Sequence, residues 1–502
     1  MMHLLRRFFC CTLACAALAC ALPSASAVEL SDVPDGFWAD EAIQGCLRED
    51  YLYAGSDGSF GVGKEVTRAE FAAILCRFFG WKPAVPPDQV YDDVPTSSWY
   101  AGAVETALRQ GALTGVSKEF RPDDPVTREE VAVALVRALG YTTFAGRAQQ
   151  LHRTFPDVKS NAGYISIAYS LGLMDGVSAN AFSPSGHVTR EQAAVILMRL
   201  HEKLREGSPS RSGILSSAEN LPSLSGYESI GVSAYRMAFN GRPQLTLNME
   251  PDAVDAVRAA ARAAGTPQLL HVTGGSYQFR EGGAEDTAEV ILDAVRADRY
   301  DGVFLEIVGL TSTPQRKELN ALAELLREGL GSGLLYIAAE APSWEGRLPG
   351  YDYSALGEIA DRLVLTIDSP VEEIGDWTAA PPEPLEEIYY SLRRMRGLVD
   401  AGKLSLMIPS AGSVWGEDVQ GESITGSKIQ ELLADGETKS FYSGRFGCAY
   451  FESMWEDTPV SIWYLNGQAV QDRIQLGSLF NVEQLCVREL DCALPEFLEA
   501  LP

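Results

Sequence analysis

Three arginines occupy the same position in a repeated motif, and their charge makes them the first candidates for binding chemistry. The motif reads Val-Thr-Arg followed by two further residues, the second Glu or Gln, and it contains Arg68, Arg128 and Arg190. The Thr, with Glu or Gln three residues later, predicts a capping box that places each Arg at the first helical position. Because the helix dipole disfavours a cation there, an Arg at this position in all three motifs indicates a site for an anionic ligand.

A structural role for these arginines stays open beside the binding role. Each repeat begins with an Asp-Val pair, and a salt bridge from the Arg to that acid would explain the charge without a ligand. The acids are Asp32, Asp93 and Asp157. Trp38 and Trp99, with Tyr164 in the third repeat, offer flat faces for sugar rings, although packing into a core is the alternative role for an aromatic side chain.

The segments that carry these motifs resemble the S-layer homology repeats of bacterial surface proteins. We place the repeats at 28–84, 88–141 and 152–204, with their Thr residues at intervals of about 60 residues. The resemblance implies an α-helical prism of three repeats that binds secondary cell-wall polymer or peptidoglycan through Arg68, Arg128 and Arg190. In the third repeat Gly163 stands where Trp99 stands in the second, which implies a weaker third groove.

A second set of candidate residues lies in one apolar run of the C-terminal region. The run reads YDGVFLEIVGL from Tyr300 to Leu310 and predicts a β-strand. Because residues two apart on a strand face the same side, we expect Phe304, Glu306 and Val308 to share a face.

The elements around this run predict an α/β barrel. Apolar runs at 268–272, 302–308, 334–339, 362–367, 403–408 and 484–490 alternate with helical patterns such as 253–264 and 316–330. Strands that alternate with helices form a parallel sheet, and about 250 residues suit one (β/α)₈ barrel. We therefore expect a multidomain chain: the helical prism, a Ser/Gly/Pro-rich linker at 205–226, and a TIM-type barrel at 227–502.

Residues 300–310 resemble the fourth-strand motif of glycoside hydrolase family 18, Asp-Gly-x-Asp-x-Asp-x-Glu. The resemblance implies a general acid at the last position of that motif, and Val308 stands there. Valine has no proton to give, so the family's catalysis is not expected. Ile367 and Arg488 stand where the family has a Tyr and a Trp.

Several roles for the barrel follow from these residues. We expect a non-catalytic barrel that binds glycan or a partner protein, with Asp368 and Arg488 as glycan-binding candidates. The alternatives are a glycosidase acting on peptidoglycan or another N-acetylglucosamine polymer, and a structural envelope protein in which the barrel is a spacer. A glycosidase would need a relocated acid, for which Glu306 and Glu340 are the candidates, with Asp368 also retained. His271 ends a strand, where a lone His is expected to be structural.

Composition and the first residues indicate export. Residues 1–27 have the form of a signal peptide: two Arg, an apolar run, and a cleavage site at Ala25-Ser26-Ala27. No later stretch predicts a membrane span. The formal net charge of −27 argues against nucleic acid and anionic lipid as partners. We expect a protein secreted to the cell wall or S-layer surface.

Five cysteines lie beyond the signal segment, a number that does not predict a disulfide framework in so long a chain. Cys46 and Cys76 could pair within the first repeat, but buried free thiols are the expected state. No Cys or His spacing suggests a metal, and we expect no cofactor.

Overall fold

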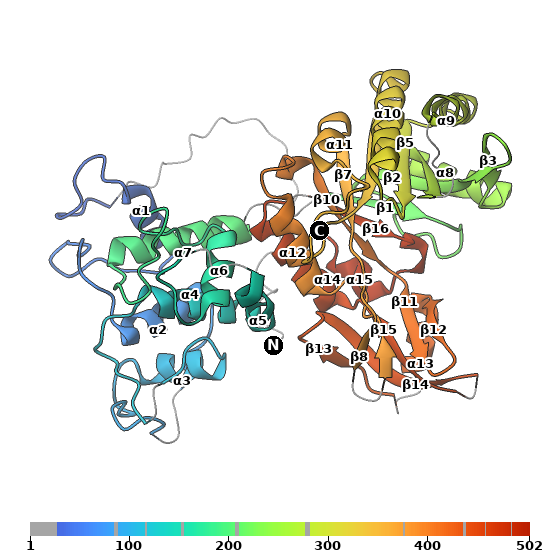
Figure 1. The fold of residues 1–502 in the computed structure, drawn as a ribbon. Coiled ribbons are helices and arrows are strands. Elements are labelled where there is room, and N and C mark those ends of the chain that lie inside the picture. The colour runs from blue at the N-terminus through green and yellow to red at the C-terminus, as the bar shows by residue number, and fades with distance from the viewer. Residues whose placement is uncertain are drawn as a thin grey trace, which may run out of the picture. The chain divides into compact units, whose positions relative to one another are not determined.

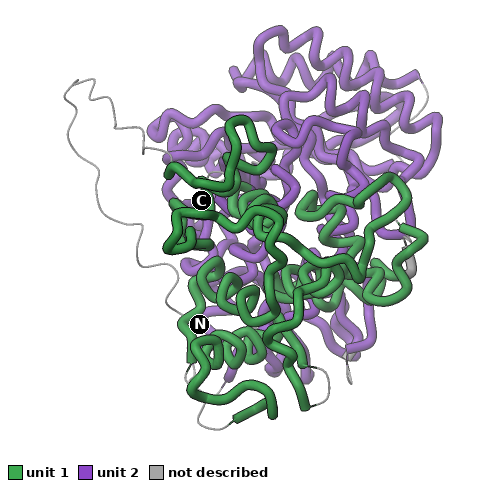
Figure 2. The backbone as a smooth tube through the Cα atoms, turned by 90° about the vertical axis from the view of Figure 1, so that its left-hand side faces the viewer, with its two compact units in different colours: residues 1–202 green, residues 203–502 purple. Residues whose placement is uncertain are grey.

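The computed structural model describes residues 28–84, 89–115, 118–151, 155–205, 210–276, 282–374, 377–434, 438–456, 458–482 and 484–502. The chain divides into two compact units, Met1–Glu202 and Lys203–Pro502 (Figure 2). The predicted signal peptide lies outside the described residues. Within the described ranges, no helix is both long enough and apolar enough to cross a membrane.

The N-terminal unit is helical, and each repeat ends in a helix that begins at a motif arginine (Figure 1). Repeat 1 supplies α1 and α2, repeat 2 supplies α3 and α4, and the third supplies α6 and α7, with α5 between the second and third repeats. The bounds are α1 Asp40–Arg48, α2 Arg68–Phe78, α3 Ala101–Arg109, α4 Arg128–Ala138, α5 Thr142–Leu151, α6 Ala162–Ser170 and α7 Arg190–Arg205.

A ring of backbone hydrogen bonds joins the three repeats just before their motif helices. The N–H of Val66 donates to Val188 O (2.9 Å), that of Val126 to Val66 O (2.8 Å), and that of Val188 to Val126 O (3.1 Å). Each repeat therefore donates to one neighbour and accepts from the other. The repeats meet around a pseudo-threefold axis, as the prism requires.

The predicted capping boxes form in full at two of the three motif helices. Thr67 with Glu70, and Thr127 with Glu130, make both reciprocal hydrogen bonds at the starts of α2 and α4. At α7 only half of the box forms: Gln192 accepts from the Thr189 N–H at 3.2 Å, while the buried Thr189 Oγ1 has no partner among the described residues.

The C-terminal unit is a closed barrel of eight parallel strands, which confirms the predicted fold. The order is β1-β16-β10-β7-β6-β5-β4-β2, and β2 pairs again with β1. The bounds are β1 Ser210–Leu215, β2 Tyr227–Phe239, β4 Gln268–Gly275, β5 Gly302–Val308, β6 Leu334–Glu340, β7 Arg362–Thr366, β10 Leu404–Pro409 and β16 Gln484–Arg488. An additional strand, β3 (Pro243–Leu247), pairs antiparallel with β2.

Helices follow the barrel strands, and apolar side chains fill the interior. The helices are α8 Pro251–Ala264, α9 Ala284–Asp298, α10 Thr313–Leu330, α11 Tyr353–Ile359, α12 Leu385–Met395, α14 Gly467–Leu479 and α15 Pro495–Ala500. A buried cluster that includes Phe304, Tyr336 and Met407 packs inside the strands. The interior is therefore a packed core, and ligands can enter only near the barrel ends.

The segment 205–226, predicted as a linker, instead supplies the first barrel strand. β1 pairs in parallel with β16 on one side and β2 on the other, and Ile214 is buried in the barrel core. The prediction was wrong because the strand is short and lies between Ser-, Gly- and Pro-rich turns. The barrel therefore begins before the predicted boundary at residue 227.

A small antiparallel sheet is inserted between β10 and β16. Its order is β12-β11-β15-β14-β13, with bounds β11 Gly412–Gly416, β12 Gln420–Ile424, β13 Phe441–Ser443, β14 Cys448–Trp455 and β15 Thr458–Tyr464. Helix α13 (Gly426–Leu433) lies within the insertion, and a hairpin of β8 (Glu372–Ile374) and β9 (Trp377–Ala379) follows β7.

All five cysteines beyond residue 27 are free, as expected. Cys46 and Cys76 do not pair: their sulfurs lie 3.6 Å from the carbonyls of Ala194 and Ala103 respectively. Burial raises the pKa of Cys46 to about 12 and that of Cys76 to about 11. These thiols are therefore unreactive at neutral pH.

Candidate wall-binding grooves and barrel pocket

The three motif arginines occupy equivalent places, each packed against a phenylalanine of the next repeat around the axis. In each pair the Arg Nε donates to the Phe carbonyl at 2.7–2.8 Å, and the guanidinium lies over the ring. The pairs are Arg68–Phe120, Arg128–Phe182 and Arg190–Phe60, with guanidinium-to-centroid distances of 4.6, 4.7 and 4.9 Å. These contacts give the arginines a structural role in joining neighbouring repeats.

Arg68 differs from the other two in having all its donor nitrogens engaged. It is only 3% exposed, its Nη1 forms an ion pair with Glu130, and its Nη2 donates to Thr114 O at 3.0 Å. Arg128 and Arg190 are half-buried, and their Nη1 groups have no hydrogen-bond partner among the described residues. Of the three, therefore, Arg128 and Arg190 keep a donor for an anion.

The opening Asp of each repeat does not form the salt bridge considered from the sequence. Asp32 accepts the backbone N–H groups of Phe60, Gly61 and Val62 at 2.6–2.8 Å, and so fixes the turn within its own repeat. Asp157 holds the equivalent turn of the third repeat. Burial raises the pKa of Asp32, but the backbone donors outweigh burial and hold that pKa below its ordinary value.

The two tryptophans proposed for sugar contact project into solvent. Trp38 is 63% exposed and Trp99 is 69% exposed, more than any other large apolar side chain in the described ranges. In the third repeat Ser160 stands at the equivalent place, because α3 and α6 correspond residue by residue from Ala101 and Ala162. Gly163, expected at the Trp99 position, is instead the counterpart of Gly102, and a Cβ there would lie 1.9 Å from Ala145 O of α5. Tyr164 packs under the Arg137 guanidinium instead.

Inside the barrel, Glu306 is held between a histidine and an arginine. It is 3% exposed; its Oε1 accepts from Arg488 Nη2 at 2.6 Å, and its Oε2 lies 3.0 Å from His271 Nε2. Burial raises the pKa of Glu306, but the hydrogen bond from His271 and the charge of Arg488 outweigh it and lower the pKa to about 2. Glu306 is thus a carboxylate at neutral pH and has no proton to donate.

The other residues of the expected site are spread around the barrel mouth. Val308 ends β5 and is partly exposed, and Glu340 at the end of β6 accepts from the Tyr351 hydroxyl (2.9 Å) and the Gly309 N–H (3.0 Å). Asp368 is exposed and does not line the pocket described next, although its neighbour Ile367 does. Of the expected pair, only Arg488 lines that pocket.

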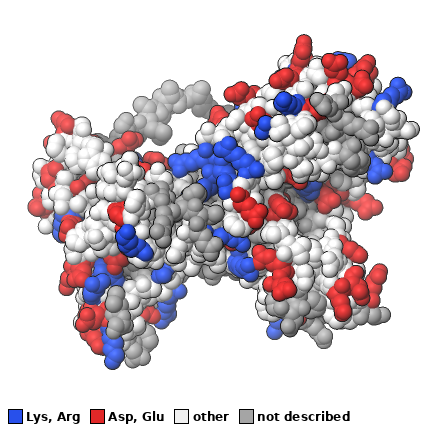
Figure 3. All heavy atoms as spheres, viewed as in Figure 1, with Lys and Arg blue, Asp and Glu red and all other residues white. Residues whose placement is uncertain are grey.

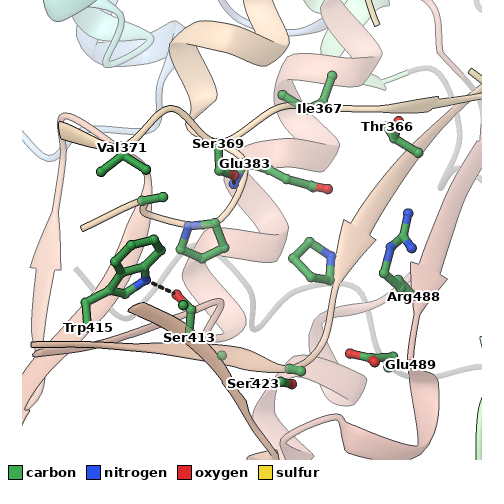
Figure 4. A pocket seen from close by; sticks show the side chains of 16 residues that line it. Thr366, Ile367, Ser369, Val371, Glu383, Ser413, Trp415, Ser423, Arg488 and Glu489 are labelled. Atoms are coloured by element: carbon green, nitrogen blue, oxygen red, sulfur yellow. Dashed lines mark hydrogen bonds between the residues drawn. The ribbon is translucent and has the colours of Figure 1, made fainter. Parts of the chain in front are cut away.

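A pocket of about 530 Å³ opens where β7, β10 and β16 end. The small inserted sheet forms one side through Trp415, whose Nε1 donates to Ser413 Oγ at 3.0 Å. Arg488 lies on the opposite side, with the carboxyl groups of Glu383 and Glu489 also at the lining (Figure 4). The C-terminal end of the strands is where (β/α)₈ barrels bind their ligands.

Glu383, which sequence reasoning missed, is the most unusual group in this pocket. Its residue is 7% exposed, its backbone has a left-handed φ of 43°, and its Oε2 has no partner among the described residues. Burial raises its pKa to about 8 against the opposing charges of Arg473 and Arg488. The only signal in the sequence is an acid within the proline-rich run 381–384.

Acidic side chains are spread over the visible face of both units (Figure 3). No group of three or more His, Cys, Asp or Glu in the described ranges is arranged to hold a metal ion.

These features define two kinds of module, S-layer homology repeats followed by a TIM-type barrel. The family model of the S-layer homology domain matches residues 30–72, 90–132 and 154–194, so the predicted repeats are confirmed. Such repeats mark a cell-surface protein anchored to the cell wall, which is the predicted location.

Relatives match part of this chain, and a solved structure resembles its barrel. The chain is 33% identical over 177 residues to an amylopullulanase of Thermoanaerobacterium thermosulfurigenes and 30% identical over 207 residues to the surface-layer 125 kDa protein of Lysinibacillus sphaericus. These matches cover 34% and 40% of this chain, but only 9% and 17% of the relatives. A class V chitinase of Pseudomonas fluorescens Pf-5 superposes with a TM-score of 0.50 at 15% identity, covering 59% of this chain and 98% of that one, which supports the barrel fold.

Proposed function

We propose that this protein binds secondary cell-wall polymer through its S-layer homology repeats and presents a barrel that binds glycan without hydrolysing it. The observation that carries the second part is the state of Glu306. Val308 stands at the position of the family's acid, and the neighbouring Glu306 is kept ionised by His271 and Arg488. General acid catalysis needs a protonated group within reach of the glycosidic oxygen, and this centre offers none.

Two features support wall binding: exposed tryptophans in the first two repeats, and arginine donors that are not used within the part of the protein described. Trp38 and Trp99 are exposed aromatic faces, while the third repeat has Ser160 at the position of Trp99. Among the residues that the structure describes, the Nη1 groups of Arg128 and Arg190 have no hydrogen-bond partner, which suits an acidic polymer. The wall contact is therefore expected to be unequal among the three grooves.

One observation favours hydrolysis as a second candidate function. Glu383 is a buried carboxyl that lines the pocket and stays protonated at neutral pH, which is the condition a general acid must meet. Glu489 lines the same pocket and could supply a second carboxyl. On this alternative, cleavage would use Glu383 in place of Glu306 and Glu340, the acids considered from the sequence.

The wall-binding proposal predicts that Trp38→Ala and Trp99→Ala each weaken sedimentation with purified host walls. Binding hot spots are enriched in Trp and cost more than about 1 kcal/mol when truncated, so each change should weaken binding at least about fivefold. Both side chains are largely exposed, so these changes should leave the fold intact, whereas a change of the buried Arg68 would disturb it. Co-sedimentation with a concentration series of walls measures the effect.

Phe441→Ala is the matched control, because Phe441 is another exposed aromatic residue but lies in the C-terminal unit. It should sediment like the unaltered chain. Unchanged wall binding of the double Trp variant would remove these residues from the contact.

A further inference from the structure

We propose that the barrel pocket recognises a carboxylate-bearing sugar, with Glu383 acting as a neutral hydrogen-bond donor and Arg488 as the cation. This inference rests on the proposed glycan-binding function and names the ligand class for its pocket. It adds Glu383 as the residue that determines specificity.

The backbone around Glu383 holds its side chain in one place. The Glu383 N–H donates to Ser369 Oγ at 2.9 Å, and its carbonyl accepts from the fully buried Arg473 at 2.6 Å. Arg473 also donates to Pro382 O at 2.9 Å. A left-handed φ at a residue other than glycine costs free energy and persists only where its surroundings enforce it, often at functional sites.

Glu383 lies at the lining of the pocket, and its buried Oε2 is not paired within the part of the chain that the structure describes. Its Oε2 has no hydrogen-bond partner among the described residues, although only 7% of the residue is exposed. In Figure 4 the carboxyl extends toward the side on which Arg488 lies. A buried polar group without a partner is costly, and a bound ligand would remove that cost.

Arg488 retains donors for a ligand after its ion pair with Glu306. Only its Nη2 is engaged among the described residues, which leaves Nε and Nη1 available. A guanidinium presents its donors in a fixed fork that matches a carboxylate. A neutral sugar would use only part of this arrangement.

The other groups around Glu383 allow an anion to enter. Arg473 is positive, with its Nη groups bonded to four carbonyls, while Glu306 is neutralised by Arg488. Burial keeps Cys448 and Cys486 protonated by raising the pKa of each to about 12. Glu489 is the remaining acid at the lining, and burial raises its pKa as well. A protonated Glu383 adds no repulsion, and its O–H can donate a hydrogen bond to the ligand's carboxylate.

The protonation of Glu383 gives the binding a defined pH dependence. With a pKa of about 8, Glu383 is neutral at pH 7 and ionised at pH 9, while a sugar carboxylate is ionised at both. The ionised form cannot donate and repels the ligand. Affinity should therefore fall about tenfold between pH 7 and pH 9, one proton being taken up per ligand bound at the higher pH.

The test titrates the mature chain by calorimetry with two disaccharides, N-acetylglucosaminyl-N-acetylmuramic acid and di-N-acetylchitobiose, which differ in the lactyl carboxylate. We expect the acidic disaccharide to bind at least about tenfold more tightly at pH 7, as a charge-assisted contact predicts. In Glu383→Gln, which keeps a neutral donor, binding at pH 7 should persist and its fall toward pH 9 should disappear. Glu489→Gln, the matched control at the other carboxyl of the pocket, should keep that fall.

Each other outcome overturns a different part of the account. Equal affinity for the two disaccharides would overturn the carboxylate class while leaving glycan binding in place. A pH dependence that survives Glu383→Gln would remove Glu383 from recognition. No heat with either sugar at any pH would contradict the proposed function itself, and reducing-end release abolished by Glu383→Gln would make Glu383 a general acid instead.

Discussion

Replacing Arg68 with Ala should lower the melting temperature of the N-terminal unit by about 6–20 °C. Arg68 is almost fully buried, and its loss leaves Glu130, Phe120 O and Thr114 O without their donor. Removing one partner of a buried ion pair costs about 3–5 kcal/mol, and each kcal/mol shifts the melting temperature of a domain of this size by about 2–4 °C. Scanning calorimetry of the whole chain measures the shift in the transition of this unit.

Arg128→Ala is the matched control for this prediction. It occupies the equivalent place in the next repeat, with the same Nε bond and the same ring beneath it, but it has no ion pair with a carboxylate among the described residues and is half-buried. It should therefore lower the melting temperature by clearly less. Equal decreases in melting temperature from the two variants would show that the Arg68–Glu130 ion pair does not stabilise the unit.

Arg488→Ala should destabilise the barrel by about 3 kcal/mol at pH 7. The change leaves the Glu306 carboxylate buried and without its cation. The expected cost is at the low end of the range for breaking a buried pair, because the Arg488 side chain is 36% exposed. Adding Glu306→Gln to this variant should restore most of the loss, since it removes the unpaired charge.

The destabilisation by Arg488→Ala should shrink as the pH falls. In the unaltered chain the pKa of Glu306 is lowered to about 2 from an ordinary 4.5, so its pairing stabilises the fold above pH 4.5, and this contribution is lost as the pH falls toward 2. Without Arg488 the carboxyl is protonated more readily, which relieves the unpaired charge in acid. Urea unfolding of the unaltered chain and of Arg488→Ala at pH 7 and pH 4 measures the loss of stability at each pH. A loss at pH 4 as large as that at pH 7 would contradict this electrostatic origin.

The repeats could be predicted from the sequence because the patterns that identify them are local. A threonine cap and its glutamate lie three residues apart, so the capping boxes of α2 and α4 needed no tertiary information. The partners of the motif arginines were not readable, since Arg68 reaches Phe120 and Glu130 of another repeat. The ion pair of Arg68 therefore emerged only from the structure.

The barrel was predictable in outline, but not its first strand or its pocket. Long apolar runs such as 302–308 identified six of the eight strands, but not β1 or β2; β1 is six residues long and lies in a polar context. The role of Glu383 depends on contacts made across about 90 residues of chain with Arg473 on α14. Its burial and left-handed backbone have no signature in the residue types alone.

One measurement tests most directly whether the barrel binds glycan without cleaving it. The chain from residue 28 onward is mixed with wall oligosaccharides that carry the muramic carboxylate, and heat of binding and newly formed reducing ends are followed in parallel. We expect saturable binding with reducing ends at the level of the blank, because the loss of a general acid removes about 10² to 10⁴ in rate. Steady release of reducing ends that either Glu306→Gln or Glu383→Gln abolishes would contradict the account and make the protein a glycosidase.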